Sequence, residues 1–300
     1  MLENCELCGF RCKVNRNQTK GVCKCGMLPK LALVSTHMWE EPCISGEAGS
    51  GTIFFSGCNF SCVFCQNYVI SQENYGQEIS IERLAEIFLE QQNRGVNNIN
   101  LVSPTPYVSM IIEALKIAKG NGLNIPVVYN TNGYETVETI KSLNGLVDVY
   151  LPDLKYFDDE IGRRYSKIPN YFEVASVAVL EMYKQVGAPI LDENGIIQKG
   201  VIIRHLIMPG NIMQTKKILD WIKANLPSNV YISVMAQYFP TYQAKEDKII
   251  NRKISKREYE IVVDLLMDFE NVYIQDLGTH EEEYVPNFDL SGIKKKEKSF

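Results

Sequence analysis

Three cysteines, Cys58, Cys62 and Cys65, stand close together and directly follow an apolar run that ends in Gly57. Cysteine thiolates are the protein ligands of iron–sulfur clusters, and a cubane [4Fe-4S] cluster has four irons to ligate. Three thiolates therefore leave one iron open, and an open iron can bind and transform a small molecule. The spacing predicts a reactive iron–sulfur site in a loop at the end of a strand.

All nine cysteines of the chain lie within its first 65 residues. The sequence shows no export signal, and clustered cysteines in the reducing cytosol more often bind metal than form disulfides. Four cysteines of an earlier group could form a tetrahedral zinc site or hold a second iron–sulfur cluster. The spacing leaves both alternatives open. These candidate ligands are Cys5, Cys8, Cys12 and Cys23.

Two further residues between the thiol groups have side chains that could ligate a metal. Cys43 is too far from either group to be assigned by spacing, and we expect it to be a buried apolar thiol. For His37, one of three histidines, we favour a packed or surface role over a catalytic or ligand role.

Composition excludes several classes of protein. The chain has 300 residues, of which 45% are hydrophobic and 22% are charged, as in ordinary globular domains. Its net charge of −5 lacks the basic footprint of a nucleic-acid-binding protein. No apolar run approaches the roughly 20 residues needed to span a bilayer. We therefore expect a cytoplasmic protein that binds neither nucleic acid nor membrane.

From residue 52 onward, two hydrophobic patterns alternate along the chain. Short apolar runs predict strands, whereas apolar residues spaced three and four apart predict helices. A strand-then-helix series predicts a parallel sheet with helices outside it. The predicted strands are 31–35, 52–56, 98–102, 126–129, 147–151, 201–207, 230–235 and 271–275, the helices are 80–95, 108–120, 137–143, 158–165, 171–186, 213–226 and 256–267, and a β-hairpin covers 190–199.

Six strand–helix units favour an α/β fold of the partial (β/α)6, TIM-like barrel type over a flat doubly wound sheet, which the same periodicity also allows. Three regions follow from this interpretation. Residues 1–50 form a small cysteine-rich, metal-binding extension, residues 51–275 form the barrel, and residues 276–300 form a C-terminal tail. The lysine-rich run 294–298 in that tail is expected to be a solvated end.

Polar residues gather where the predicted strands end. In parallel α/β architectures, ligands bind at the carboxyl ends of the strands. Six strand ends carry polar or ligating residues, so we expect them to share one rim and to form a binding site there. These stretches are Cys58–Cys65, Ser103–Thr105, Asn130–Gly133, Asp153–Lys155, Arg204–His205 and Gln237.

These motifs resemble those of a known family. The spacing Cys58-x3-Cys62-x2-Cys65, with Phe64 before the last cysteine, resembles the signature of radical S-adenosylmethionine (SAM) enzymes. Stretches 130–133 and 153–155 resemble the branch typified by pyruvate formate-lyase-activating enzyme. The N-terminal cysteines, together with stretches 37–42 and 170–173, resemble an activating-enzyme-related subgroup. The resemblance covers residues 5 to about 275.

The resemblance implies a partial barrel that holds one [4Fe-4S] cluster on Cys58, Cys62 and Cys65. SAM would chelate the fourth iron through its amino and carboxylate groups. A reduced cluster would then cleave SAM to methionine and a 5′-deoxyadenosyl radical, which abstracts a hydrogen atom. An electron donor such as flavodoxin or ferredoxin is implied as a partner.

The resemblance also implies roles for individual residues, but it assigns no catalytic residue. Ser103 and Thr105 stand where the methionine amino group of SAM is contacted, and Arg204 stands near its carboxylate or ribose. Phe64 is a further implied SAM contact. The implied positions for a monovalent cation and for polar contacts to SAM are Asn130, Thr131 and Asp153.

Three hypotheses about the target remain at this point. The first is a glycine of a glycyl-radical enzyme, as in the activating enzymes. The second keeps the radical chemistry but gives it another peptide or a small molecule. The third, which we favour least, is a non-catalytic zinc-binding protein.

Overall fold

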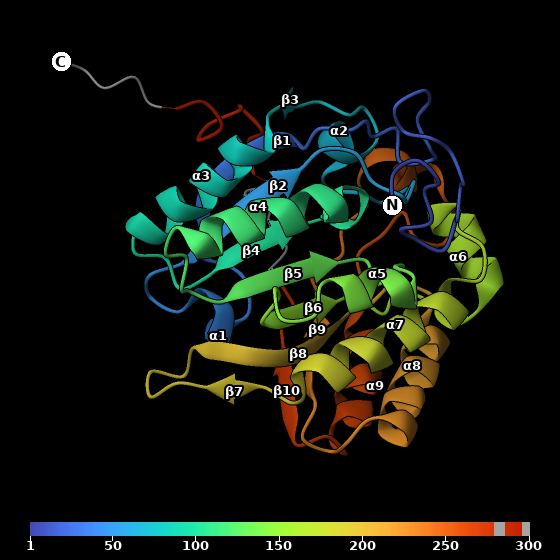
Figure 1. Ribbon diagram of the computed structural model, residues 1–300. Helices are drawn as coiled ribbons and strands as arrows, with labels where there is room; N and C mark the ends of the chain where they lie inside the picture. Colours follow the sequence, from blue (N-terminus) through green and yellow to red (C-terminus); the bar gives the residue numbers. More distant parts are fainter. Residues whose placement is uncertain (279–285, 296–300) are drawn as a thin grey trace.

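One large sheet organises the chain in the computed structural model, which describes residues 1–278 and 286–295 (Figure 1). Its central strands pair in parallel in the order β2-β4-β5-β6-β8-β9-β10. All seven were predicted to within a few residues at each end, except that β8 begins earlier. They are β2 (Ser50–Phe55), β4 (Ile99–Val102), β5 (Val127–Thr131), β6 (Val149–Pro152), β8 (Ile197–Leu206), β9 (Tyr231–Met235) and β10 (Asn271–Ile274).

Antiparallel strands extend the β2 edge of this sheet and flank β8. β1 (Lys30–His37) pairs with β2, and β3 (Gln77–Glu78) pairs with β1. β7 (Ile190–Leu191) pairs with β8, which confirms the predicted hairpin. β8 then continues without a break into the residues from 201 onward, which were predicted as a separate strand. The strand order runs from β10 to β3, and these ends do not pair among the described residues. The fold is the predicted partial barrel.

Helices cover the outer face of the sheet (Figure 1). α3 shows why: Ser80 caps it by accepting the N–H of Arg83, and its apolar stripe at Leu84, Ile87 and Phe88 is buried. Two short helices were not predicted. The helices are α1 (Pro42–Ser45), α2 (Tyr68–Ser71), α3 (Ile81–Asn93), α4 (Val108–Gly120), α5 (Val137–Ser142), α6 (Asp159–Ser166), α7 (Tyr171–Val186), α8 (Ile212–Asn225) and α9 (Lys256–Leu266), with 3-10 turns at Thr105–Tyr107 and Tyr242–Glu246.

Within residues 1–278 and 286–295, no helix combines the length and the apolar character needed to cross a membrane.

Side-chain alternation divides each strand between the helices and the barrel interior. On β5, Tyr129 belongs to the main core cluster, whereas Val128 belongs to a separate cluster with Leu151 and Ile202. Successive side chains of a strand point to opposite faces. Asn130, two residues after Val128, therefore faces the interior together with the charged residues described below.

Helix α1 lies at the end of the barrel where the parallel strands begin, whereas the N-terminal coil lies beside their arrowheads (Figure 1). Cys43 and Ile44 of α1 are buried in the same interior cluster as Val128. This confirms that Cys43 is a buried apolar thiol, and burial raises its pKa to about 11. The segment between β1 and α1 consequently reaches the barrel interior from the end at which the parallel strands begin.

Part of the predicted C-terminal tail packs against the barrel. The N–H of Leu290 donates to Ala32 O at 3.1 Å, and Ser291 O accepts from Val34 N at 2.9 Å. The ring of Phe288 lies 5.5 Å from that of Phe54, edge to face. Of the lysine-rich run, 294 and 295 are exposed, and 296–298 lie outside the described residues.

His205 points from β8 away from the interior, toward α8. Its Nδ1–H donates to Leu154 O at 2.6 Å, so Nε2 accepts from the Thr215 hydroxyl at 2.8 Å. Burial lowers its pKa to about 4. We expect stability to fall by up to about 3 kcal/mol as the pH drops from about 6.5 to about 4, because the unfolded chain takes up a proton that folded His205 refuses.

Urea unfolding at pH 7 and pH 4.5 checks this expectation. The variant His205→Gln keeps a donor and an acceptor but has no titrating group. It should lose less stability than the wild type between the two pH values. Equal losses would show that His205 does not carry this pH dependence.

Candidate active site

The cysteine loop follows β2, and its thiols are held by separate neighbours. The backbone also fixes the loop, because the N–H of Ser61 donates to Ser166 O at 3.1 Å. In the described part of the chain, no three Cys, His, Asp or Glu side chains lie close enough together to hold one metal ion. Cys58 Sγ accepts from Phe60 N at 3.3 Å, Cys62 Sγ lies 2.9 Å from Ser166 Oγ, and Cys65 Sγ lies 3.2 Å from Ser71 Oγ.

An aromatic cluster supports this loop from the strand ends. The ring of Phe60 packs edge to face on Tyr134 and Tyr171, with centroids 5.6 and 5.8 Å apart. The Tyr171 hydroxyl lies 2.7 Å from Asp153 O and accepts the N–H of Lys155 at 3.0 Å. Tyr171 therefore connects the end of β6 to the cysteine loop.

The thiols of the loop resist ionisation in the absence of further positive charge. Burial is the main cause and raises the pKa of all three, that of Cys62 to about 12. The thiolate of Cys65 would raise the pKa of Cys62 further, whereas Lys155 lowers it. Three partly buried thiols without a histidine or carboxylate among them suit an iron–sulfur cluster, whose positive iron ions stabilise the thiolates. The donor set therefore fits the predicted cluster.

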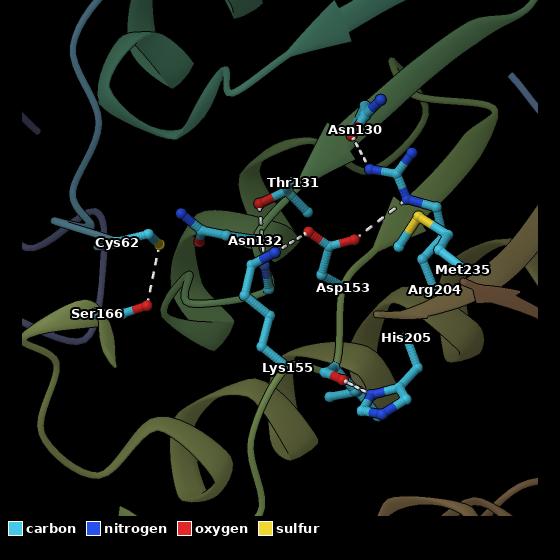
Figure 2. Close-up of polar contacts among 12 residues, drawn as sticks. Cys62, Asn130, Thr131, Asn132, Asp153, Lys155, Ser166, Arg204, His205 and Met235 are labelled. Atoms are coloured by element: carbon cyan, nitrogen blue, oxygen red, sulfur yellow. Dashed lines mark hydrogen bonds and ion pairs between the residues drawn. The ribbon is translucent and has the colours of Figure 1, made fainter. Parts of the chain in front are cut away.

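A charged network occupies the barrel interior next to the loop (Figure 2). The carboxylate of Asp153 lies between two cations, 2.6 Å from Lys155 Nζ and 3.1 Å from Arg204 Nε. Arg204 also donates to Asn130 Oδ1 at 2.6 Å and contacts Glu40 Oε2 at 3.3 Å. Figure 2 shows Lys155 on the side of Cys62, and Arg204 on the opposite side of Asp153.

Electrostatics keep the centre of this network ionised. Burial alone would raise the pKa of Asp153, but Lys155 and Arg204 outweigh it and lower that pKa. Burial opposes the charge of Arg204, but nearby carboxylates raise its pKa, Asp153 most strongly. The pKa of Glu40 is raised because burial outweighs Arg204. Asp153 is thus the ionised partner that both cations share.

A cleft of about 470 Å³ runs from the cysteine loop to this network. Gln66 and Asn67, directly after the loop, line this cleft together with Asn130 and Arg204. An adjoining recess of about 230 Å³ leads further toward the end of the barrel that α1 covers. The remaining cleft residues are His37, Trp39, Glu40, Phe54, Val102, Gln237, Ile274, Gln275, Asp276 and Pro286.

The structure brings together only some of the residues predicted to contact SAM. Asn130 and Arg204 line the cleft, and Asp153 contacts Arg204. Phe64 is buried, 5.9 Å from the ring of Tyr238. The carboxylate assigned to a monovalent cation, that of Asp153, has both oxygens paired with protein cations.

The predicted contacts at the end of β4 lie elsewhere. Thr105 Oγ1 donates to Glu135 Oε1 at 2.5 Å, and the Thr131 hydroxyl donates to the same oxygen. Neither threonine is among the residues that line the cleft. Ser103 has a positive φ of 59° and precedes the 3-10 turn that contains Thr105.

Sequence reasoning missed several polar residues of the site. Glu40, Glu41 and Lys155 lie within stretches 37–42 and 153–155 but had no predicted role, and Glu135, which is fully buried, was not predicted as a site residue. Their position in the sequence could have indicated a role, because each of these charged residues lies within or next to one of the motifs described above. Burial of the carboxylates could not be read from the sequence.

The N-terminal cysteines lie beside the cysteine loop. Cys5, Cys8, Cys12 and Cys23 all line one cavity of about 20 Å³, together with Arg16, Asn59 and Thr105. Asn59 belongs to the loop, and its Oδ1 accepts from Asn132 Nδ2 at 2.7 Å. Asn59 Oδ1 also lies 3.7 Å from Cys58 Sγ, so this residue lies beside both groups of thiols.

Arg16 is a buried cation in this N-terminal segment. It is 3% exposed and donates to the carbonyls of Cys25, Gly26 and Pro106. No ion pair of Arg16 with a carboxylate occurs among the described residues. Its positive charge lowers the pKa of Cys23, after the stronger effect of a hydrogen bond with Cys25.

Comparison with known proteins decides the family. The sequence model of the Radical SAM superfamily matches residues 52–222, from β2 through α8. The chain belongs to the radical SAM superfamily. Membership implies a [4Fe-4S] cluster and SAM as cofactors, and the predicted cluster loop, Cys58–Cys65, lies within the matched region.

Relatives of this radical SAM protein occur in Methanocaldococcus jannaschii. One uncharacterized protein is 39% identical over 278 residues, which cover 88% of this chain and 75% of the relative. A second is 25% identical over 249 residues, covering 79% and 67%. A radical SAM methyltransferase from Sphaerobacter thermophilus has a TM-score of 0.51 at 13% identity, covering 75% of this chain and 65% of that structure. At this identity, the likeness to the methyltransferase shows the fold alone.

Proposed function

We propose that this radical SAM protein is an enzyme whose [4Fe-4S] cluster is held by Cys58, Cys62 and Cys65, with SAM in the adjoining cleft. The observation that supports this most is the position of the three thiols, at the end of β2 and beside a cleft of about 470 Å³. When bound, the cluster and SAM would supply radical chemistry for hydrogen abstraction, and the protein would supply binding and orientation.

Each charged residue of the network has a role in this proposal. Lys155 offsets the negative charge of the thiolates, because it already lowers the pKa of Cys62. Arg204 presents a guanidinium at the cleft wall, where it can bind a carboxylate or a ribose of SAM. Asp153 and Asn130 hold Arg204 in this orientation through contacts of 3.1 and 2.6 Å. The carboxylate of Asp153 thus acts through Arg204 and Lys155.

For the substrate, we propose a glycine of a glycyl-radical enzyme, with flavodoxin or ferredoxin as electron donor. The resemblance of stretches 130–133 and 153–155 to activating enzymes supports this. The alternative is another peptide or a small molecule. A glycyl radical signal in a partner enzyme from the same cell, detected by electron paramagnetic resonance, would favour the first substrate. SAM cleavage without that signal would favour the second.

The N-terminal thiols are proposed to bind a metal centre of their own, either zinc or a second iron–sulfur cluster. They would have to draw closer together on binding, because no three of them are close enough to hold one ion in the described part of the chain. Four cysteines line one small cavity, and the buried cation Arg16 lies beside them. A buried charge without a partner is costly. Thiolates bound to a metal would supply the opposite charge that Arg16 otherwise lacks among the described residues.

Formation of 5′-deoxyadenosine tests the proposed reaction. After anaerobic reconstitution with iron and sulfide, the wild type is expected to produce it from SAM and dithionite. Cys62→Ala should produce none above background, because one cluster ligand is missing. Cys43→Ala is the matched control, since that buried thiol lies in the interior apolar cluster with Val128, which contains none of the loop cysteines. Equal product from the wild type and Cys62→Ala would contradict the proposal.

A further inference from the structure

Two adjacent carboxylates, Glu40 and Glu41, enter the barrel from the segment before α1. Both line the recess of about 230 Å³ that continues the cleft, and we call this cavity the acidic recess. Arg204 is shared between the recess and the cleft. A molecule that fills the cleft can therefore extend one end into the acidic recess.

The two carboxylates differ in how they are satisfied. Glu40 Oε1 accepts from Asn100 Nδ2 at 3.0 Å, and Glu40 Oε2 contacts Arg204. Glu41 is only 8% exposed, and its Oε2 has no hydrogen-bond partner among the described residues. A buried polar atom without a partner costs about 1–3 kcal/mol and more when charged. Glu41 thus has capacity for a donor that the protein itself does not supply.

The charges around the recess also leave Glu41 uncompensated. Asp153 is paired with Lys155 and Arg204, and Glu40 is paired with Arg204. The interior network therefore contains three carboxylates and two cations. Burial raises the pKa of Glu41, and Arg204 only partly opposes it. One additional positive charge in the recess would make the number of cations equal to the number of carboxylates.

The walls of the recess suit such a charge. Trp39 and Tyr273 line it with aromatic side chains, and Ser233 adds a hydroxyl. Carboxylates provide hydrogen-bond acceptors for ammonium and guanidinium groups, and aromatic rings attract cations over their faces. Arg204 also lines the recess, but its charge is paired with Asp153 and Glu40, so the other acidic and aromatic side chains suit a basic group.

We infer that the acidic recess binds a basic nitrogen of the substrate, as an ammonium or guanidinium group that Glu41 contacts. This inference rests on the proposed function, because it takes the ligand to be the molecule that reacts in the adjoining cleft. It narrows the substrate class to amines, guanidines and peptides that present a lysine, an arginine or a free amino terminus. In this scheme Glu41 determines which substrate binds, whereas SAM lies in the adjoining cleft and not in the acidic recess.

Binding of n-butylguanidinium and n-butylammonium to the anaerobically reconstituted full chain tests the inference. Calorimetric titration should detect one of these cations and no binding of n-butanol at the same concentrations. Glu41→Gln should weaken the cation at least about 10-fold, which corresponds to about 1.4 kcal/mol. Glu41→Asp should retain part of the affinity. Glu47→Gln, an exposed position near α1, is the matched control and should bind as the wild type does.

Three outcomes would overturn the inference: equal binding of n-butanol, equal cation affinity in Glu41→Gln, and exclusion of the cation by saturating SAM. Circular dichroism during thermal unfolding establishes that Glu41→Gln is folded, and Glu41→Asp provides the comparison if it is not. None of these measurements needs SAM to be cleaved. A failure of the radical chemistry and a failure of this inference therefore give different results.

Discussion

Replacing Cys58, Cys62 and Cys65 together by alanine is expected to remove about four iron atoms per chain, the content of one cubane cluster. The reason is that these thiols are the proposed ligands, and burial makes them poor thiolates unless positive iron is present. Iron and sulfide analysis after anaerobic reconstitution, together with Mössbauer spectroscopy, measures the loss. The formation of 5′-deoxyadenosine should disappear with the iron.

A second variant distinguishes the metal bound by the N-terminal cysteines from the metal bound by the cysteine loop. Alanine at all four N-terminal positions should remove either one zinc ion or a further cluster, and should leave the iron of the cysteine loop in place. Cys43→Ala should keep the full wild-type metal content. If the triple variant of the loop retained wild-type iron, the assignment of the cluster to Cys58, Cys62 and Cys65 would be wrong. The four N-terminal positions are Cys5, Cys8, Cys12 and Cys23.

Asp153→Ala is expected to lower the free energy of unfolding by about 3–5 kcal/mol, the usual effect of breaking a buried ion pair from one side. The side chains of Asp153, Lys155 and Arg204 are only 12%, 17% and 14% exposed. Removing the shared carboxylate leaves two neighbouring cations facing each other. Urea unfolding of the apoprotein under reducing conditions measures the change.

Two further variants make this prediction specific. Adding Lys155→Met to Asp153→Ala should restore part of the stability, because it removes the cation that has lost its carboxylate, whereas Arg204 still contacts Glu40. Asp220→Ala breaks the ion pair of Asp220 with Lys216 on α8, where Asp220 is 61% exposed. That control should cost less than about 1 kcal/mol. Equal losses for Asp153→Ala and Asp220→Ala would show that the interior network does not behave as a buried ion pair.

Much of the barrel could be predicted because its strands are short, apolar and separated by amphipathic helices. The positions of Asn130, Asp153 and Arg204 at strand ends followed from the same alternation. Their contacts with one another depend on strand order, which brings β5, β6 and β8 side by side. The strand-end rule therefore located these residues but could not pair them.

Other parts of the site depend on local geometry that the sequence pattern does not carry. Ser103 adopts a left-handed φ of 59°, and the following turn directs the Thr105 hydroxyl to the buried carboxylate of Glu135 instead of the cleft. Glu41 reaches the interior because β1 runs antiparallel to β2, so the chain leaves β1 at the opposite end of the barrel. Neither consequence follows from composition or periodicity.

The placement of every cysteine before residue 66 has a consequence for how the protein is made. At a synthesis rate of about 5–20 residues per second, the chain from Cys65 to Tyr171 takes roughly 5 to 20 s to be made. During this time, the thiols lack Ser166 and Tyr171, which later hold the loop in place. We therefore expect iron and sulfide to be delivered only after Ser166 and Tyr171 have been made, and the unfinished chain to need reducing surroundings that keep its nine thiols unoxidised.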